Sequence, residues 1–321
     1  MRLIFPALRL LLGFTTLFGA GLALAADPYP VKTVRVLTTE TGSANDLMIR
    51  LITPGMSAAL GQPMIVENRG MVSMELLAKA PPDGYTLLAF GPPLWLLPLL
   101  RANNVPWDAV RDFAPITQAM SIPTIVGVHP SVPAHSVKEL IALAKAKPGA
   151  LNYATSFPGS SSQLSGELFK AMAGVDIVAV SYKGPAQALN ALIAGEAQVS
   201  FVNAAASVSA HIKSGRLRAL AVANLQPSPL FPDLPTVAAS GVPGYQSATI
   251  IGLFAPAKTP DAVIERLNQE AVRMLRRPEV KEKLLSSGSE VIAGTPEQFA
   301  ATIRTEIATW GKVIKDSNIH E

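Results

Sequence analysis

Two short polar loops hold the residues best suited to bind a small anion. The first runs from Thr38 to Asp46, and the second runs from Ser156 to Gln163. Each loop follows an apolar run typical of a strand and precedes a helical pattern, so each lies at a helix N-terminus. The backbone N–H groups there lack partners inside the helix and the helix dipole is positive, which favours an anion. We therefore expect the pair to bind one anion, although either loop alone could serve only to cap its helix.

The elements that position these loops follow from hydrophobic periodicity. The runs that predict strands are 34–37, 64–67, 85–90, 124–128, 151–155, 177–182, 198–202, 217–223 and 249–255. Their Val, Ile and Leu content is typical of strands buried on both faces. Capping patterns at Ser136 and Thr295 mark helix starts, as does Thr259 before Pro260. Pro54 should kink or shorten the first helix. Repeated strand–helix units predict an α/β fold.

The residue types exclude several kinds of catalytic site. The chain has no cysteine, which excludes disulfides, thiolate metal sites and a cysteine nucleophile. Its histidines, at positions 129, 135, 211 and 320, show no metal-ligand spacing. A nucleophile elbow, a Walker loop and G-x-G-x-x-G are all missing from the sequence. We therefore predict no catalytic residue, no metal and no cofactor.

The N-terminal segment has the pattern of a secretory signal peptide. Arg2 and Arg9 precede an apolar run, residues 10–24, that closes on an A-x-A cleavage pattern at Ala25. We predict that residues 1–25 are a signal peptide and that the mature chain is exported, with no stable membrane insertion. Without the two arginines the formal charge falls from +4 to +2. Because basic and aromatic residues do not interleave, nucleic acid is not expected as a partner.

Phrases spread over the whole mature chain resemble one family, the substrate-binding proteins of tripartite tricarboxylate transporters, which are Bug-type periplasmic solute receptors. The phrases include "LGQPMIVENR", "APPDGYTLLAFG", "GELFKAMAGVDIVAVSYKGPAQAL" and "FPDLPTVAASGVPGY". The resemblance implies a two-lobed periplasmic-binding-protein fold, type II-like, with two mixed sheets flanked by helices and two crossover strands at the hinge. Lobe 1 would comprise residues 26–125 and 250–321, and lobe 2 residues 126–249.

The resemblance also implies a function. Members of the family are periplasmic and bind small organic carboxylates in the cleft, where the two loops close on the carboxylate. The partners would be the membrane transporter subunits, and we expect the receptor itself to be a monomer.

Some positions of the two loops match the family pattern and others depart from it. In the first loop Gly42 and Asp46 match the family pattern. Asp46 could order the loop against the ligand, or it could only stabilise the N-terminus of its helix. In the second loop Gly159 and Ser160 match, whereas Phe157 replaces a glycine and Gln163 a histidine. A Gly-rich loop is also missing after residue 69, where the chain is about four residues shorter. The candidates for ligand contact are Glu40, Thr41, Gly42, Ser43, Asp46, Trp95, Ser156, Phe157, Gly159, Ser160, Ser161, Gln163, Tyr182 and Asn203.

The segment "GPPLWLLPLL" bears on the kind of ligand. It follows a strand that should end at the cleft, where related proteins often have small polar residues. Val202 also stands where an aspartate is common. These changes favour an aromatic or otherwise apolar monocarboxylate, with its ring near Trp95 and Phe157. Trp95 could instead pack inside its lobe, and Glu40 could recognise the amine of an amino acid.

Three functions remain open from the sequence. The leading hypothesis is a periplasmic receptor that delivers a carboxylate to a membrane transporter. The second is a sensor subunit that docks on a signalling receptor, since both roles need the same cleft. The third is a periplasmic enzyme on the same fold, which the lack of an acid–base or nucleophile set disfavours.

Overall fold

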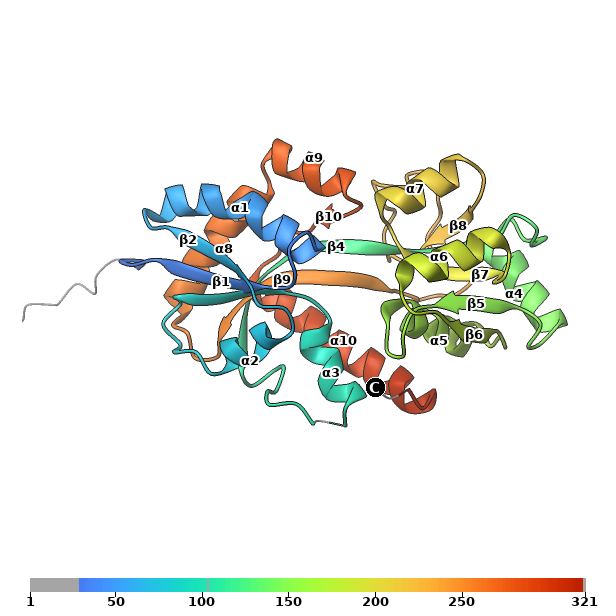
Figure 1. Ribbon diagram of the computed structural model, residues 1–321, viewed down its shortest axis with the longest axis horizontal. Helices are drawn as coiled ribbons and strands as arrows, with labels where there is room; N and C mark the ends of the chain where they lie inside the picture. The colour runs from blue at the N-terminus through green and yellow to red at the C-terminus, as the bar shows by residue number, and fades with distance from the viewer. Residues whose placement is uncertain (1–28, 103, 320–321) are drawn as a thin grey trace, which may run out of the picture.

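The computed structural model describes residues 29–102 and 104–319; the predicted signal peptide and His320 lie outside them. The chain forms two lobes, which Figure 1 shows side by side along the long axis. The first lobe contains β1 (Val34–Thr38), α1 (Ala44–Leu60), β2 (Met64–Asn68), α2 (Val72–Ala78), β3 (Thr86–Phe90), α3 (Pro93–Leu100), α8 (Asp261–Leu275), α9 (Pro278–Ser286), β10 (Glu290–Val291) and α10 (Pro296–Asp316). The second contains α4 (Val137–Ala146), β5 (Asn152–Thr155), α5 (Ser161–Ala173), β6 (Val178–Ser181), α6 (Pro185–Ala194), β7 (Val199–Asn203), α7 (Ala206–Lys213) and β8 (Arg218–Val222).

Two long strands connect the lobes, β4 (Phe113–Val128) and β9 (Ala248–Pro256). The strand order is β2-β1-β3-β9-β4-β7-β5-β6, and β8 and β10 also pair with β4. Residues 113–123 of β4 pair with β9 in the first lobe, and residues 124–128 pair with β7 and β8 in the second. The two predicted sheets are therefore joined through one strand. The predicted lobe boundaries fall within β4 and β9.

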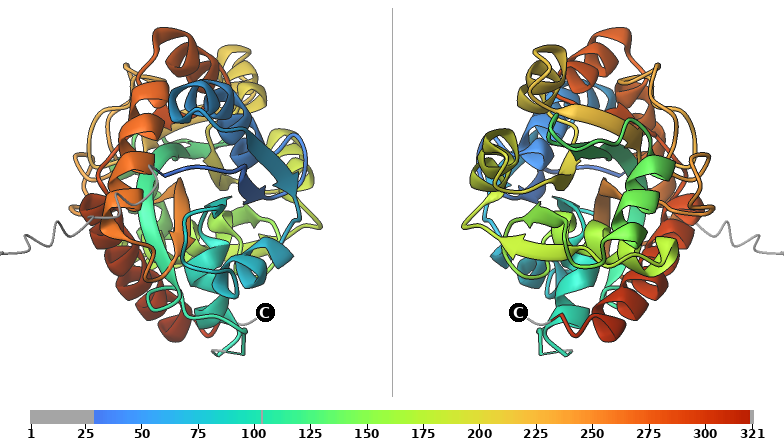
Figure 2. Two further views of the ribbon diagram at one scale, coloured as in Figure 1. Left: turned by 90° about the vertical axis from the view of Figure 1, so that its left-hand side faces the viewer. Right: turned by 90° about the vertical axis from the view of Figure 1, so that its right-hand side faces the viewer.

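Helices cover both faces of each sheet, as the end-on views in Figure 2 show. Parallel pairing of β1 with β2 and β3 requires crossovers, which α1 and α2 provide. Helix α1 buries a stripe of Met48, Ile49, Ile52 and Met56. It continues through Pro54 to Leu60, so the expectation that Pro54 shortens it is wrong. The predicted capping box at Thr295 is confirmed by reciprocal hydrogen bonds with Gln298.

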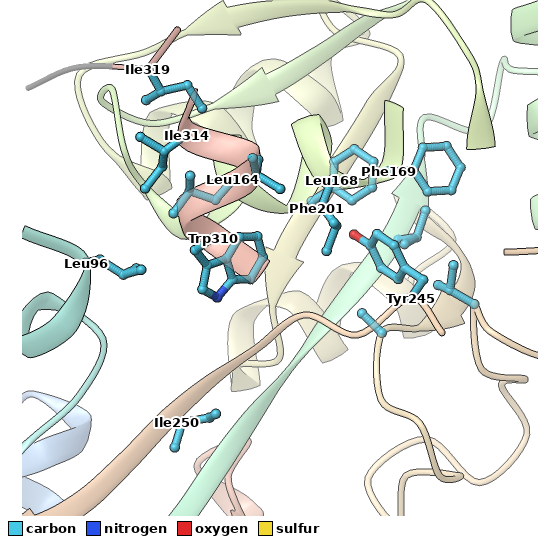
Figure 3. Close-up of a cluster of buried hydrophobic side chains, with 14 of the residues drawn as sticks. Leu96, Leu164, Leu168, Phe169, Phe201, Tyr245, Ile250, Trp310, Ile314 and Ile319 are labelled. Atoms are coloured by element: carbon cyan, nitrogen blue, oxygen red, sulfur yellow. The ribbon is translucent and has the colours of Figure 1, made fainter. Parts of the chain in front are cut away.

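The C-terminal helix contacts both lobes. Helix α10 buries Phe299, Ile303, Trp310, Val313 and Ile314. It packs against α3 and β4 in its own lobe and against α5 in the other. Trp310 and Ile314 belong to the same buried cluster as Leu164 of α5 (Figure 3). Because this apolar contact joins α10 to the second lobe, it limits how the lobes can move.

A polar contact joins the lobes at a second place. Glu290 of β10 accepts a hydrogen bond from Asn224 Nδ2 at 3.1 Å and another from Ser228 Oγ, both beyond β8. Gly288 lies directly against the second lobe, because a Cβ there would be 2.3 Å from the Ala204 carbonyl oxygen. Burial raises the pKa of Glu290, and the two hydrogen bonds partly offset that effect.

Glu306 of α10 should make stability depend on pH. Burial raises its pKa to about 7, against an opposing hydrogen bond from Trp310 Nε1 at 2.7 Å. Because the folded chain holds this proton more tightly than the unfolded chain, its stability should fall as the pH rises from about 4.5 to about 7. Glu306→Gln keeps the acceptor and removes the charge. The variant should gain on the order of 1–3 kcal/mol over the wild type at pH 8.

Urea denaturation of both proteins at pH 5 and pH 8 measures this difference. Glu282→Gln, at an exposed position on α9, is the matched control and should show no such change. An equal difference between Glu306→Gln and wild type at both pH values would contradict the assignment.

Candidate ligand-binding site between the lobes

The first polar loop lies at the carboxyl end of β1 and is closed by its own side chains. Ser43 is the N-cap of α1, and its hydroxyl accepts a hydrogen bond from Asp46 N. The Asp46 carboxylate accepts from Gly42 N at 2.9 Å, Arg50 Nε at 2.7 Å and Asn68 Nδ2 at 2.8 Å. Asp46 is only 3% exposed. Burial would raise its pKa, but these hydrogen bonds outweigh burial and lower it. Asp46 therefore orders this loop.

The second loop, at the carboxyl end of β5, repeats this arrangement. Ser160 is the N-cap of α5 and accepts from Gln163 N, while Gln163 Oε1 accepts from Gly159 N at 2.7 Å. Gly159 has φ +76°, and Gly42 in the first loop has φ +83°. Both positions are in the left-handed region, where glycine carries no steric penalty. Gln163 thus plays the part in the second loop that Asp46 plays in the first.

This closure changes which amides can meet a ligand. We expected the amides around Gly42 and Ser43, and those around Gly159 to Ser161, to face one ligand. The amides of Gly42, Ser43, Gly159 and Ser160 are bonded inside their own loops. The first-turn amides of α1 and α5 follow directly, and such groups have no intrahelical partner, so they are the ones left for a ligand.

A pocket of about 490 Å³, here called the interlobe pocket, lies between the second loop and α3. Its wall is largely apolar on the α3 side. It is lined by Met71, Pro92, Pro93, Leu96, Leu97, Leu100, Arg101, Phe157, Pro158, Gly159, Ser160, Ser161, Asn203 and Thr249. Both lobes and the strand β9 contribute, so the pocket sits where movement of the lobes would change its shape.

A second pocket, of about 390 Å³ and here called the helix-end pocket, adjoins it in the second lobe. Ser161 and Asn203 line both pockets. Residues at the N-termini of three helices line the helix-end pocket: Ser161 of α5, Pro185 of α6, and Ala205 and Ser207 on either side of the first residue of α7. Three positive helix ends around one cavity favour a bound anion. The two pockets together suit a ligand with one anionic and one apolar part.

Asn203 connects the pockets to the hinge. Its Nδ2 donates to Thr249 Oγ1 of β9 at 2.9 Å, and its Oδ1 accepts from Thr124 Oγ1 of β4 at 3.3 Å. This predicted site residue therefore ties β7 to both crossover strands. Thr124 and Thr249 were not among the predicted site residues, although their place at the expected crossings was a usable signal.

The predicted site residues separate into two groups. Ser156, Phe157, Gly159, Ser160, Ser161 and Asn203 line one or both pockets. Gln163 lies behind its loop, and Tyr182 packs half-buried against Ala154, Ala188 and Ala197. The first-loop residues Glu40, Thr41, Gly42, Ser43 and Asp46 line neither of the two pockets. In this arrangement of the lobes the second loop lines both pockets and the first loop lines neither.

Trp95 lies elsewhere, and the expectation that its ring contacts ligand is corrected here. It is 1% exposed, lies beside Glu306 of α10, and lines a separate cavity with Trp107. The reason is helical periodicity, because the segment forms α3 rather than a loop. Positions 93, 96, 97 and 100 face the interlobe pocket, and Trp95 points away from that stripe. This i, i+3, i+4, i+7 spacing was the signal that sequence reasoning missed.

The described residues contain neither a cluster of metal ligands nor a membrane-spanning helix. Within residues 29–102 and 104–319, no three His, Asp or Glu side chains gather as metal ligands would. No helix in that same part of the chain combines the length and apolar character needed to cross a bilayer.

Asp46→Asn should destabilise the protein. An amide cannot accept all three hydrogen bonds, so the loss at pH 7 should be roughly 1–3 kcal/mol. Because the folded-state pKa is lowered, the carboxylate stabilises the fold above its unfolded-state pKa and loses that effect as the pH falls through the folded-state value. Urea denaturation should therefore show a constant difference between variant and wild type from pH 7 down to about pH 4, the ordinary pKa of an aspartate, and a shrinking difference below it. A difference that stays constant down to pH 3 would contradict the role of the charge.

Comparison with known proteins agrees with this architecture. Residues 48–319 match the family described as the tripartite tricarboxylate transporter family receptor. Protein BugT of Bordetella pertussis is 30% identical over 311 residues, which cover 95% of each chain. Among solved structures, R. palustris Rpa4515 with adipate is 32% identical, with a TM-score of 0.71 over 91% of this chain and 99% of that one.

A further solved structure supports the same assignment. MatC (Rpa3494) from Rhodopseudomonas palustris with bound malate is 28% identical, with a TM-score of 0.67 over 89% of this chain and all 100% of that one. The predicted family and the two-lobed periplasmic-binding fold are both confirmed. This chain belongs to the tripartite tricarboxylate transporter receptor family.

Proposed function

We propose that this receptor captures a small carboxylate with an apolar body in the cleft and delivers it to a membrane transporter of the tripartite tricarboxylate type. One observation carries the proposal: a cavity at three helix N-termini shares Ser161 and Asn203 with a cavity between the lobes that has exposed apolar side chains. The carboxylate would bind in the helix-end pocket, and the body of the ligand would lie in the interlobe pocket.

The helix-end pocket can supply much of the binding free energy. Each exposed helix end contributes about 0.3–1 kcal/mol toward an anion. Each hydrogen bond to a charged group adds about 1.5–3 kcal/mol. Three ends and a few bonds from Ser161, Ser162 and Ser207 can approach the roughly 8 kcal/mol of a micromolar complex.

The interlobe pocket favours one kind of chemistry for the part of the ligand other than its carboxylate. Met71 and Phe157 present exposed apolar surface at this pocket, which stabilises an apolar ligand by about 25 cal/mol for each Å² that it covers. A small, highly hydrated carboxylate would leave this surface uncovered. The proposal therefore favours aromatic and longer aliphatic carboxylates over citrate.

Isothermal titration calorimetry tests the ligand class. The panel contains benzoate, phenylacetate, adipate, succinate, citrate and several amino acids. Benzoate, phenylacetate or adipate should bind more tightly than citrate by about tenfold or more, and benzamide should not bind because it lacks the charge. Preference for citrate or for an amino acid would overturn the apolar assignment, and binding of no carboxylate would overturn the receptor assignment.

Deletion of the gene tests delivery. Uptake of the radiolabelled carboxylate identified by calorimetry should fall, and a plasmid copy should restore it. Unchanged uptake together with altered transcription would favour a sensor subunit instead. Turnover of the bound carboxylate by the purified protein would favour an enzyme.

A further inference from the structure

Two exposed apolar side chains flank the interlobe pocket from opposite lobes. Met71 precedes α2 in the first lobe and is 46% exposed, and Phe157 in the second loop is 58% exposed. Both line the interlobe pocket. Because both side chains are about half exposed, a ligand in the pocket can cover their remaining apolar surface.

Other exposed apolar residues do not share this position. The described part of the chain also exposes Val72, Leu76, Met172 and Leu225 to a similar degree, and none of these lines the interlobe pocket. Exposure alone therefore does not distinguish Met71 and Phe157. What distinguishes them is that they belong to different lobes and share one pocket.

The lobes already touch next to this pair. A Cβ at Gly159 would lie 2.8 Å from Leu100 Cδ1, so the second loop approaches α3 closely at this point. A side chain at position 159 would require the Leu100 side chain to shift. The contact holds the loop that carries Phe157 against the lobe that carries Met71, and both side chains remain at the pocket.

We propose that Met71 and Phe157 form an apolar clamp that selects ligands by the polarity of their body. A carboxylate with an apolar body covers both side chains and so favours the arrangement in which the lobes lie together. A small polar carboxylate uses only the helix-end pocket and gains nothing from the clamp. This inference rests on the proposed function and names the residues that set its specificity.

The clamp predicts a change in the ratio of affinities. Met71→Ser and Phe157→Ser should each weaken the binding of phenylacetate by about five- to tenfold, as expected for losing a few tens of Å² of apolar contact. Binding of succinate should change by less than about twofold in the same variants. Met172→Ser and Leu225→Ser remove apolar side chains of similar exposure away from the pocket and should leave both affinities unchanged.

Calorimetry with phenylacetate and succinate on the wild type and the four variants tests the clamp. Melting temperatures establish that each variant is folded. Equal losses for both ligands in the clamp variants, or no loss for either, would overturn the clamp while the receptor assignment stands. Failure of the wild-type protein to bind either ligand or any other carboxylate of the panel would overturn the proposed function and the clamp with it.

Discussion

Both lobes depend on the backbone hydrogen bonds of one strand, β4. Its first eleven residues, 113–123, pair with β9 in the first lobe, and its last five pair with β7 and β8 in the second. A strand that pairs in two sheets fixes the direction of each sheet relative to the other at the crossing. The side chains of Thr124, Asn203 and Thr249 are hydrogen-bonded at this crossing, and two of them line the interlobe pocket. The interlobe pocket therefore lies beside the crossing, where hydrogen bonds join β4, β7 and β9.

The contacts outside the crossing restrain the lobes in two different ways. On one side α10 packs apolar side chains against α5, and on the other Glu290 receives hydrogen bonds from Asn224 and Ser228. The apolar contact tolerates small sliding, because dispersion has little directionality. The hydrogen bonds to Glu290 do not tolerate such sliding, because the strength of a hydrogen bond falls steeply as its angle departs from linear. A closing motion would therefore weaken the hydrogen bonds to Glu290 before it disrupted the contact between α10 and α5.

The sequence predicted the strands and the loops because their signals are local. Apolar runs identified the strands, and Gly42-Ser43 and Gly159-Ser160 marked two helix starts that the structure contains. The crossings near 124–128 and 249–255 came from the family resemblance, and they fall in β4 and β9.

Features that depend on tertiary structure escaped prediction. The convergence of α6 and α7 with α5 on one pocket joins segments distant in the chain, so no local pattern reports it. Trp95 was misplaced because an aromatic residue after a strand was interpreted as a pocket residue, whereas its position on α3 turns it toward α10. β10 has only two residues, too few for a periodic signal, and it forms through pairing with β4.

The two loops reach the same geometry with different charges. The acceptor that closes the first loop is the carboxylate of Asp46, and the one that closes the second is the amide of Gln163. Glu40 adds a further carboxylate to the first loop, whereas the segment 156–163 contains no charged residue. Arg50 pairs with Asp46, so Glu40 is the first-loop carboxylate that would repel an approaching anion, and salt weakens that repulsion at longer range. The second loop, without a charged side chain, offers an anion no such repulsion.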